Sequence, residues 1–407
     1  MKKILVLGSS VAGVKAIEKI RSTDKESEII LLAVDGHLPY NRDLFTKLLT
    51  QDIPENQVFY RSQSFFDDQR VHVILDKTVT RINFKKNKVY TEDKTQISFD
   101  SIIITELPQQ KLPNIKGVNK TGVFGFTKLN DALAIAKDLY TIETLAIQSS
   151  TFEGFAVAAA AAKKGREVLL VSKANAFSSI DDPIAAQWLT DLLAQRNVNV
   201  VFDNEIGEIL GDQEVKAVKL KSGKVFATEM VVFTQTFEDQ RVVADTGLEC
   251  EDRILVDASF KTNFDHVFAV DNAAAFKGDN LPEESYLTCQ TLEQEGSVVG
   301  AKLLGEQAQS QCAPEIYSVN IDDISIILMG RAKTAEGLKI IELFDREAKT
   351  YRKIVADNNI LVGAVLINQP DQKHKYWAMI QQGADISALE ESLSQPAADA
   401  GEISAES

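Results

Sequence analysis

The first 35 residues follow the order strand, glycine turn, helix, strand. Residues 3–7 are an apolar run of strand length, and the turn GSSVAG follows at once over 8–13. Residues 14–20 continue with helical spacing, and 29–34 form a second apolar run that ends at Asp35. In a βαβ dinucleotide unit the first glycine allows a tight turn, the last lets helix and strand pack closely, and the helix N-terminus faces a pyrophosphate. The segment therefore predicts an α/β fold with a nucleotide site.

A similar unit recurs from Thr144, with most of its glycines replaced. Residues 145–147 read as a strand, 155–164 as an alanine-rich helix, and 167–172 as the next strand. The turn between the first strand and the helix is SSTFEG, over 149–154. Serine and threonine stand where glycines would let a pyrophosphate approach bare backbone. The asymmetry between the two turns is the main clue to function.

The rest of the chain reads as further α/β structure. Glycines at 296 and 300 lie inside a predicted helix over 286–304, which indicates close packing against another backbone. Residues 312–383 alternate strand patterns with turns, and the segment from 385 onward has no basic residue. Other predicted elements are strands over 71–75, 79–84, 99–105, 198–202, 230–234, 254–256 and 267–270, and a helix over 183–196.

Composition excludes several classes of protein. A chain of 407 residues is long enough for two or three domains. A net charge of −15 argues against nucleic acid or an anionic membrane as the partner. No apolar run approaches membrane-spanning length and no signal peptide is evident, so we expect a cytoplasmic protein. The cysteines Cys250, Cys289 and Cys312 form no CxxC pair, so no metal site is expected.

Four segments resemble the flavoprotein reductases with two dinucleotide-binding domains, the pyridine nucleotide-disulfide oxidoreductase superfamily. They are residues 8–13, 37–47, 99–106 and 245–271. The peptide HLPYNR with the following TK is the most specific of them. The chain looks closest to the branch with rubredoxin reductases, ferredoxin reductases and the flavin portion of NADH-dependent nitrite reductases.

The resemblance implies two Rossmann-like FAD/NAD(P)-binding domains plus a small C-terminal α/β domain. The FAD-binding domain would be discontinuous, over 1–112 and 240–311, with the NAD(P)-binding-like domain inserted over 113–239. The C-terminal domain would span 312–384, and 385–407 would be a disordered acidic tail.

The resemblance also implies roles for individual residues. Three of them, Gly8, Ser10 and Gly13, would line the FAD pyrophosphate, and Asp271 would hold the ribityl hydroxyls. The remaining candidates on the flavin side are Asp35 for the adenosine ribose, Val79 for adenine through its backbone, Thr105 at a strand end, and Arg42 and Lys47 near the flavin, Lys47 being the catalytic candidate. In the second unit, Gly154 and Lys173 would contact a nicotinamide dinucleotide, and Lys173 could favour NADP or be an ordinary surface residue.

Several positions depart from the family pattern. Ser10, Glu106 and Val270 stand where glycines are usual on the flavin side. In the second unit Ala156 replaces a glutamate that lies near the nicotinamide in the family. The peptide over 41–44 lacks the cysteine of the disulfide reductases, so thiol chemistry is not expected.

The leading hypothesis is an FAD-dependent oxidoreductase. NAD(P)H would pass hydride to the flavin, which would release single electrons to a rubredoxin- or ferredoxin-type protein or to a partner subunit. Two alternatives stay open. One is a flavoprotein electron-relay or structural subunit that has lost its nicotinamide site, and the other is a scaffold that has lost FAD as well.

Overall fold

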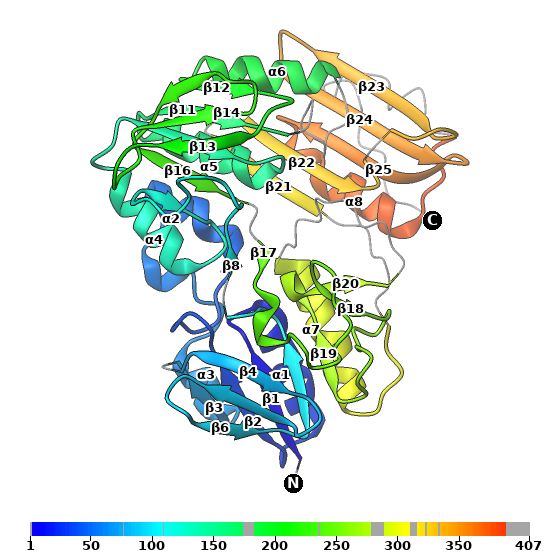
Figure 1. Cartoon of the computed structure of the whole chain (residues 1–407). Coiled ribbons are helices and arrows are strands. Elements are labelled where there is room, and N and C mark those ends of the chain that lie inside the picture. The colour runs from blue at the N-terminus through cyan, green and yellow to red at the C-terminus, as the bar shows by residue number, and fades with distance from the viewer. Residues whose placement is uncertain are drawn as a thin grey trace. The chain divides into compact units, whose positions relative to one another are not determined.

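The computed structural model describes residues 2–75, 77–108, 110–173, 183–234, 237–277, 289–309, 316–321, 324–332 and 334–387 (Figure 1). The chain divides into two compact units. One consists of Met1–Gln148 with Ile206–Gln311, and the other of Ser149–Glu205 with Cys312–Ser407.

The first unit is built on a parallel five-stranded sheet of order β19-β7-β1-β2-β3. Its strands are β1 (Lys3–Leu7), β2 (Glu28–Leu32), β3 (Val71–Ile74), β7 (Ser101–Ile104) and β19 (Val267–Ala269). The strands β1, β2 and β7 are runs of Ile, Leu and Val that are almost wholly buried, as a sheet covered on both faces requires. The chain runs outward from β1 through β2 on one side, whereas β7 lies on the other side. This reversal of strand order creates a crevice at the carboxyl ends of β1 and β7.

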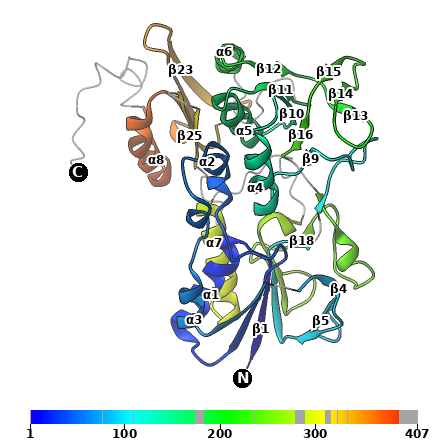
Figure 2. The ribbon, with the colours of Figure 1, turned by 90° about the vertical axis from the view of Figure 1, so that its left-hand side faces the viewer.

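Helix α1 (Val11–Thr23) packs against α7 (Cys289–Leu303) at very short range (Figure 2). A Cβ atom added at Gly296 would lie 2.1 Å from the Ala12 carbonyl oxygen, and one at Gly300 would lie 2.7 Å from Lys19 Cβ. The predicted close packing of these two glycines is therefore confirmed. The predicted start of this helix, at 286–288, lies outside the described residues.

Smaller elements complete the first unit. An antiparallel sheet is formed by β4 (Val79–Asn83), β5 (Lys88–Thr91) and β6 (Gln96–Ser98), and another by β13 (Ile206–Leu210), β14 (Ala217–Leu220) and β15 (Val225–Ala227). Parallel pairing joins β16 (Met230–Phe233) to β10 (Thr144–Gln148) and to β9 (Val123–Phe124). The remaining elements are β8 (Gln110–Lys111), β17 (Phe237–Glu238), β18 (Ile254–Val256), β20 (Ala274–Phe276), α2 (Phe45–Thr50), α3 (Gln63–Asp68), α4 (Leu129–Asp138) and the short 3₁₀ turn η1 (Arg42–Leu44).

The second unit combines a parallel strand pair with an antiparallel sheet. The pair is β11 (Glu167–Val171) with β12 (Val198–Val201), accompanied by α5 (Phe152–Lys163) and α6 (Pro183–Ala194). The sheet has the order β21-β22-β25-β24-β23, and its strands are β21 (Ile316–Ile321), β22 (Ile324–Gly330), β23 (Lys339–Asp345), β24 (Thr350–Asp357) and β25 (Ile360–Ile367). Helix α8 (Lys373–Gln382) packs on this sheet.

The core of that antiparallel sheet extends past the expected domain end at residue 384. Ile386 is fully buried with Ile354, Leu361 and Tyr376, and Asp385 forms a β-bridge to Ile360. An apolar side chain in an otherwise polar segment is thus anchored to the sheet. The rest of the expected acidic tail, 388–407, lies outside the described residues.

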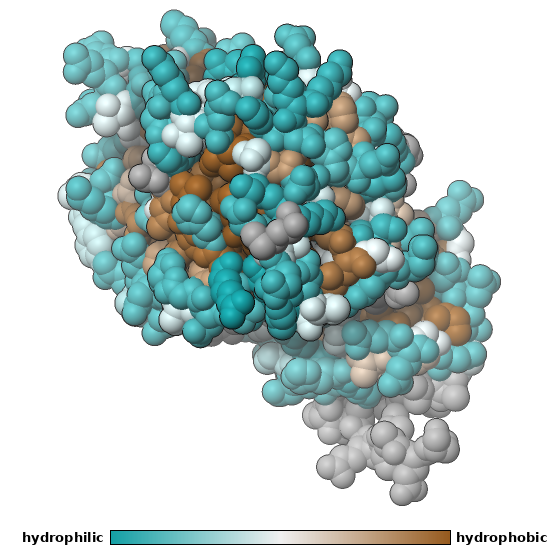
Figure 3. All heavy atoms as spheres, turned by 90° about the horizontal axis from the view of Figure 1, so that it is seen from below, coloured by the Kyte–Doolittle hydropathy of each residue, from teal (hydrophilic) through white to brown (hydrophobic). Residues whose placement is uncertain are grey.

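Hydrophilic side chains make up much of the face shown in Figure 3, with hydrophobic residues visible among them. Within the described ranges, the large hydrophobic side chains that are exposed are Tyr140 and Val225. Each helix in those ranges is too short or too polar to cross a bilayer.

Candidate functional site

The candidate site lies in the first unit, where β1 and β7 end side by side. Gly8 follows β1 directly with a φ of +123°, a conformation that favours glycine. A Cβ atom at Gly8 would lie 2.1 Å from Thr105 Oγ1, and one at Gly13 would lie 2.7 Å from Val6 Cγ1. Both glycines are therefore needed for the close approach of turn, helix and strand.

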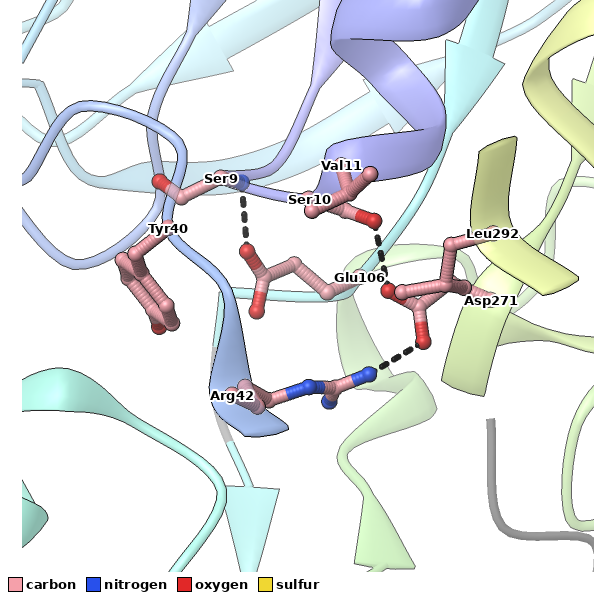
Figure 4. A pocket seen from close by; sticks show the side chains of 8 residues that line it. All are labelled: Ser9, Ser10, Val11, Tyr40, Arg42, Glu106, Asp271 and Leu292. Atoms are coloured by element: carbon pink, nitrogen blue, oxygen red, sulfur yellow. Dashed lines mark hydrogen bonds and ion pairs between the residues drawn. The ribbon is translucent and has the colours of Figure 1, made fainter. Parts of the chain in front are cut away.

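Ser10 begins α1 and links it to a carboxylate from β19. Its backbone is extended (φ −97°, ψ 150°) and its hydroxyl oxygen accepts a hydrogen bond from Ala12 N–H at 3.1 Å, so Ser10 is the N-cap. The same hydroxyl donates to Asp271 Oδ2 at 2.6 Å (Figure 4). A serine at the position of the usual middle glycine is thus accommodated because its side chain bonds to Asp271.

Asp271 lies just past β19 at the carboxyl edge of the sheet. It has a φ of +58° and its side chain is 3% exposed. Arg42 Nη2 contacts Asp271 Oδ1 at 2.5 Å, and the Asp271 N–H donates to Glu295 Oε2 at 2.7 Å. The carboxylate is held in place by Ser10 on one oxygen and Arg42 on the other (Figure 4).

Glu106 places a carboxyl group at the N-terminal turn of α1. Its Oε1 accepts a hydrogen bond from the Ser9 N–H at 2.5 Å, and the residue is 6% exposed (Figure 4). Burial, and secondarily the negative charge of Asp35, raise the pKa of Glu106 to about 8, although the Lys128 ammonium opposes the rise. Ser9 lies one residue before the N-cap Ser10, so the Glu106 carboxyl occupies the turn just ahead of the first N–H groups of α1, where anions bind well.

Asp35 follows β2 and is tied to Tyr40. The Tyr40 hydroxyl donates to Asp35 Oδ2 at 2.6 Å. Burial of the phenol, together with the charges of Glu106 and Asp35, raises the pKa of Tyr40 well above its usual value. The Asp35 carboxylate also lies 3.1 Å from Ser9 Oγ, so it faces the same turn as Glu106.

The structure brings together some of the predicted residues but not all. One pocket is lined by Ser9, Ser10, Val11, Tyr40, Arg42, Glu106, Asp271 and Leu292. Thr105 is buried beside it, and its N–H and hydroxyl both donate to the Leu7 carbonyl oxygen. Val79 is buried at the start of β4, and Lys47 is exposed on α2; neither lines this pocket.

Sequence reasoning noted Glu106 as a departure but did not assign it to the site, and it did not single out Ser9 or Tyr40. Tyr40 lies within the peptide that carries the resemblance, so its inclusion there is the signal that could have found it. A glutamate directly after a buried strand gives no indication of which way its side chain turns.

The turn of the second unit is closed by its own side chains. Ser149 is 4% exposed, and its hydroxyl oxygen accepts a hydrogen bond from Thr151 N–H at 3.1 Å. A Cβ atom at Gly154 would lie 2.0 Å from Ser149 Cβ, so serine and glycine pack directly against each other. Lys173, two residues past β11, is exposed.

The two cysteines within the described ranges are poor nucleophiles. Burial raises the pKa of Cys250 to about 11, and burial together with the charges of Glu293 and Asp43 raises that of Cys289 to about 12. At neutral pH both are thiols, and the thiolate is the reactive form. Cys312 lies outside the described residues.

Comparison with known proteins gives the family. The family model described as pyridine nucleotide-disulphide oxidoreductase matches residues 2–296. The chain belongs to this family. A second model, the rubredoxin NAD+ reductase C-terminal domain, matches residues 317–384. The resemblance drawn from the four sequence segments is therefore confirmed.

The family's members of known name include several electron-transfer proteins. The chain is 23% identical over 400 residues to the nitrite reductase [NAD(P)H] of Bacillus subtilis (strain 168), covering 97% of this chain and 49% of that protein. It is 20% identical to the assimilatory nitrate reductase electron transfer subunit of the same organism, covering 97% and 51%. The chain thus spans about half the length of these two relatives. The rubredoxin-NAD(+) reductase of Pseudomonas putida is 20% identical, with 91% of this chain and 97% of that one covered.

A solved structure confirms the predicted fold class. The covalent putidaredoxin reductase–putidaredoxin complex contains a chain that matches with a TM-score of 0.82 and 17% identity, covering 98% of this chain and 96% of that one. Such a match supports the Rossmann-like α/β architecture.

Proteins of this family use FAD and NAD(P)H, as the sequence predicts. The first unit has the features that a dinucleotide pyrophosphate needs, namely the glycine turn, the free edge of the sheet and the α1 N-terminus. The buried carboxyl of Glu106 stands in for an anionic ligand at that turn. The residues therefore fit the pyrophosphate once the Glu106 side chain has moved away.

Proposed function

We propose that this chain is an FAD-dependent oxidoreductase that passes electrons from NAD(P)H through flavin to a small redox protein of rubredoxin or ferredoxin type, or to a partner subunit. The observation that carries the proposal is the group of Ser10, Asp271 and Arg42 at the β1–α1 turn. It lies at the reversal of strand order, where dinucleotides bind in open α/β sheets.

Each residue at this turn has a task in holding the cofactor. Gly8 and Gly13 let the pyrophosphate approach backbone, and the first N–H groups of α1 donate to it. Asp271 accepts hydrogen bonds from the ribityl hydroxyls, and Arg42 and Ser10 orient its carboxylate. FAD held there would supply the chemistry, since it can accept two electrons from a nicotinamide and release them one at a time.

The remaining predicted residues keep the roles that the resemblance implies. On the flavin side, Asp35 holds the adenosine ribose, Val79 contacts adenine through its backbone, and Lys47 lies near the flavin. Gly154 and Lys173 contact the nicotinamide dinucleotide. We propose a cytoplasmic location, because NAD(P)H is the intended reductant.

The names of the relatives support the proposed partners. One relative is named a rubredoxin reductase and another an electron transfer subunit. The chain covers 49% of the nitrite reductase relative, so the other half of that relative has no counterpart in the matched region. An acceptor on a separate subunit therefore fits as well as a small carrier protein.

A second candidate function is an electron-relay subunit without a nicotinamide site of its own. Ser149 favours it, since its side chain occupies the space over Gly154 that a pyrophosphate would need. Electrons would then reach the flavin from another protein.

The absorbance spectrum of the purified protein tests the flavin part of the proposal. We expect a yellow protein with about one FAD per chain, which after reduction by dithionite transfers electrons to an added rubredoxin or ferredoxin. A colourless protein that takes up no added FAD would contradict the proposal. A reduced flavoprotein that is oxidised by neither carrier would restrict the acceptor to a partner subunit.

A further inference from the structure

The side chain of Glu106 lies where the bound anion is expected. The residue follows β7 and Thr105, and its carboxyl oxygen receives the Ser9 N–H at 2.5 Å. A Cβ atom at Gly8 would lie 2.7 Å from Glu106 Cγ, so the side chain lies directly over the glycine turn. Figure 4 shows it between Ser9 and the Arg42–Asp271 pair.

We propose that Glu106 is an internal occupant of the pyrophosphate cradle that FAD must displace, so that the chain binds flavin more tightly as the pH rises. The inference rests on the proposed function, because it concerns the same site. It adds a regulating residue that makes flavin retention depend on conditions.

The position of the Glu106 carboxyl supports displacement, because the Ser9 N–H already has this carboxyl as its acceptor. A phosphate group at the Ser9 N–H and the Glu106 carboxyl cannot occupy one position. Glutamate has several rotatable bonds, so the side chain can turn away from the turn without a change of backbone.

The charges around Glu106 explain the direction of the pH effect. Asp35 and Tyr40 face it from the loop after β2, Arg42 from η1, Lys128 from the residue before α4, and Asp271 from the end of β19. Burial and Asp35 raise the pKa of Glu106 to about 8. Below that pH the neutral acid is the form that the buried position favours, and it stays at the Ser9 N–H. Above it the buried carboxylate is disfavoured by desolvation and by Asp35, so the side chain leaves for solvent more readily and FAD displaces it at a lower cost.

FAD titration of the full-length apoprotein, followed by quenching of flavin fluorescence, tests the proposal. At pH 6.5 we expect Glu106→Ala to bind FAD at least tenfold more tightly than the unmodified protein, and at pH 9 the gain should be smaller. Glu92→Ala removes an exposed carboxylate that lies in the turn after β5 and does not line the pocket, so it serves as the matched control, with no change in FAD affinity expected.

The outcomes separate this inference from the proposed function. If the unmodified protein binds FAD and Glu106→Ala binds it no more tightly at either pH, Glu106 does not compete and the inference is overturned. If none of the variants binds FAD, the proposed function fails as well. If Glu106→Ala does not fold, Glu106→Gln serves instead, because it keeps the side-chain volume without an ionisable group. Its FAD affinity should be nearly the same at pH 6.5 and pH 9. A pH dependence equal to that of the unmodified protein would overturn the inference.

Discussion

In the two glycine turns of the chain, a backbone N–H near the start of the helix finds its acceptor in different ways. At the α1 turn the acceptor is Glu106, which comes from another strand about a hundred residues away in sequence. At the α5 turn the acceptor is Ser149, which belongs to the turn itself. Each side chain thus accepts a hydrogen bond from a turn N–H that would otherwise need another partner.

The two turns differ in how easily the side chain that fills each of them, Glu106 or Ser149, can move away. Glu106 can rotate away while the glycine turn keeps its shape. Ser149 packs so closely against Gly154 that a Cβ atom added at Gly154 would lie 2.0 Å from Ser149 Cβ, and the Ser149 Cβ stays there whatever the rotamer of its hydroxyl. We therefore expect the first turn to open for a nucleotide, and the second to bind one only weakly unless its backbone changes.

The largest expected effect concerns the pH dependence of the protein's unfolding free energy, which Glu106 at the first turn controls. The folded-state pKa of Glu106, about 8, lies above its usual value of 4.5, so the folded protein binds the proton more tightly than the unfolded chain. Stability should then fall as the pH rises between these two values, by at most about 5 kcal/mol. Glu106→Gln should remove this loss, and urea unfolding at pH 5 and pH 9 measures it.

Ser149→Ala is the control for that comparison, since it changes the occupant of the second turn without an ionisable group. Relative to the unmodified protein, the unfolding free energy of Ser149→Ala should differ by the same amount at both pH values. If the unfolding free energy of Glu106→Gln falls between pH 5 and pH 9 as much as that of the unmodified protein, the Glu106 carboxyl does not have the raised pKa that this account gives it.

A second substitution breaks the first turn. In Gly13→Leu the side chain would start 2.7 Å from Val6 Cγ1 and force α1 away from β1. We expect FAD affinity to fall on the order of 100-fold, which is about 2.7 kcal/mol. Fluorescence titration measures the affinity, and circular dichroism confirms that the variant folds. Gly207→Leu is the matched control, because a Cβ there meets nothing closer than Lys221 Cγ at 3.4 Å; flavin retained by Gly13→Leu would contradict the account.

A third substitution opens the second turn. The double variant Ser149→Gly with Thr151→Gly removes the side chain over Gly154 and frees backbone N–H groups for phosphate. The rate of flavin reduction by NAD(P)H should rise about tenfold. Ser149→Ala keeps the Cβ against Gly154 and should give no gain. Equal rates in the double variant and the unmodified chain would show that Ser149 does not limit nucleotide binding.

The smallest effect is expected at the cysteines. Since burial holds the pKa values of Cys250 and Cys289 at about 11 and about 12, neither supplies a thiolate at neutral pH. Replacing all three cysteines by serine should leave electron transfer to a carrier within a few-fold. A loss on the order of 100-fold with FAD still bound would mean that a thiol takes part.

Local patterns explain why part of this architecture could be predicted. The β1–α1 unit follows from one apolar run, two glycines and helical spacing, all within about twenty residues. Gly296 and Gly300 indicated a close helix contact for a similarly local reason. The proximity of Ser10 and Asp271, 261 residues apart in sequence, was expected through the resemblance alone.

Other features depend on tertiary contacts that no local pattern encodes. The direction of the Glu106 side chain is set by the Ser9 N–H and the charges around it. Ile386 looks like an isolated apolar residue in a polar tail, yet it is fully buried against the antiparallel sheet. The closure of the second turn was indicated by Ser149 and Thr151, whereas the hydrogen bond between them required coordinates.

Anaerobic stopped-flow bleaching of the FAD-loaded chain tests the contrast between the two turns most directly. The account predicts that dithionite reduces the flavin fully, whereas NADH and NADPH reduce it slowly at micromolar concentrations, with NADPH favoured if Lys173 meets its 2′-phosphate. Rapid bleaching of the isolated chain by micromolar NADH would contradict the account, because it would mean that a pyrophosphate binds at the second turn despite Ser149.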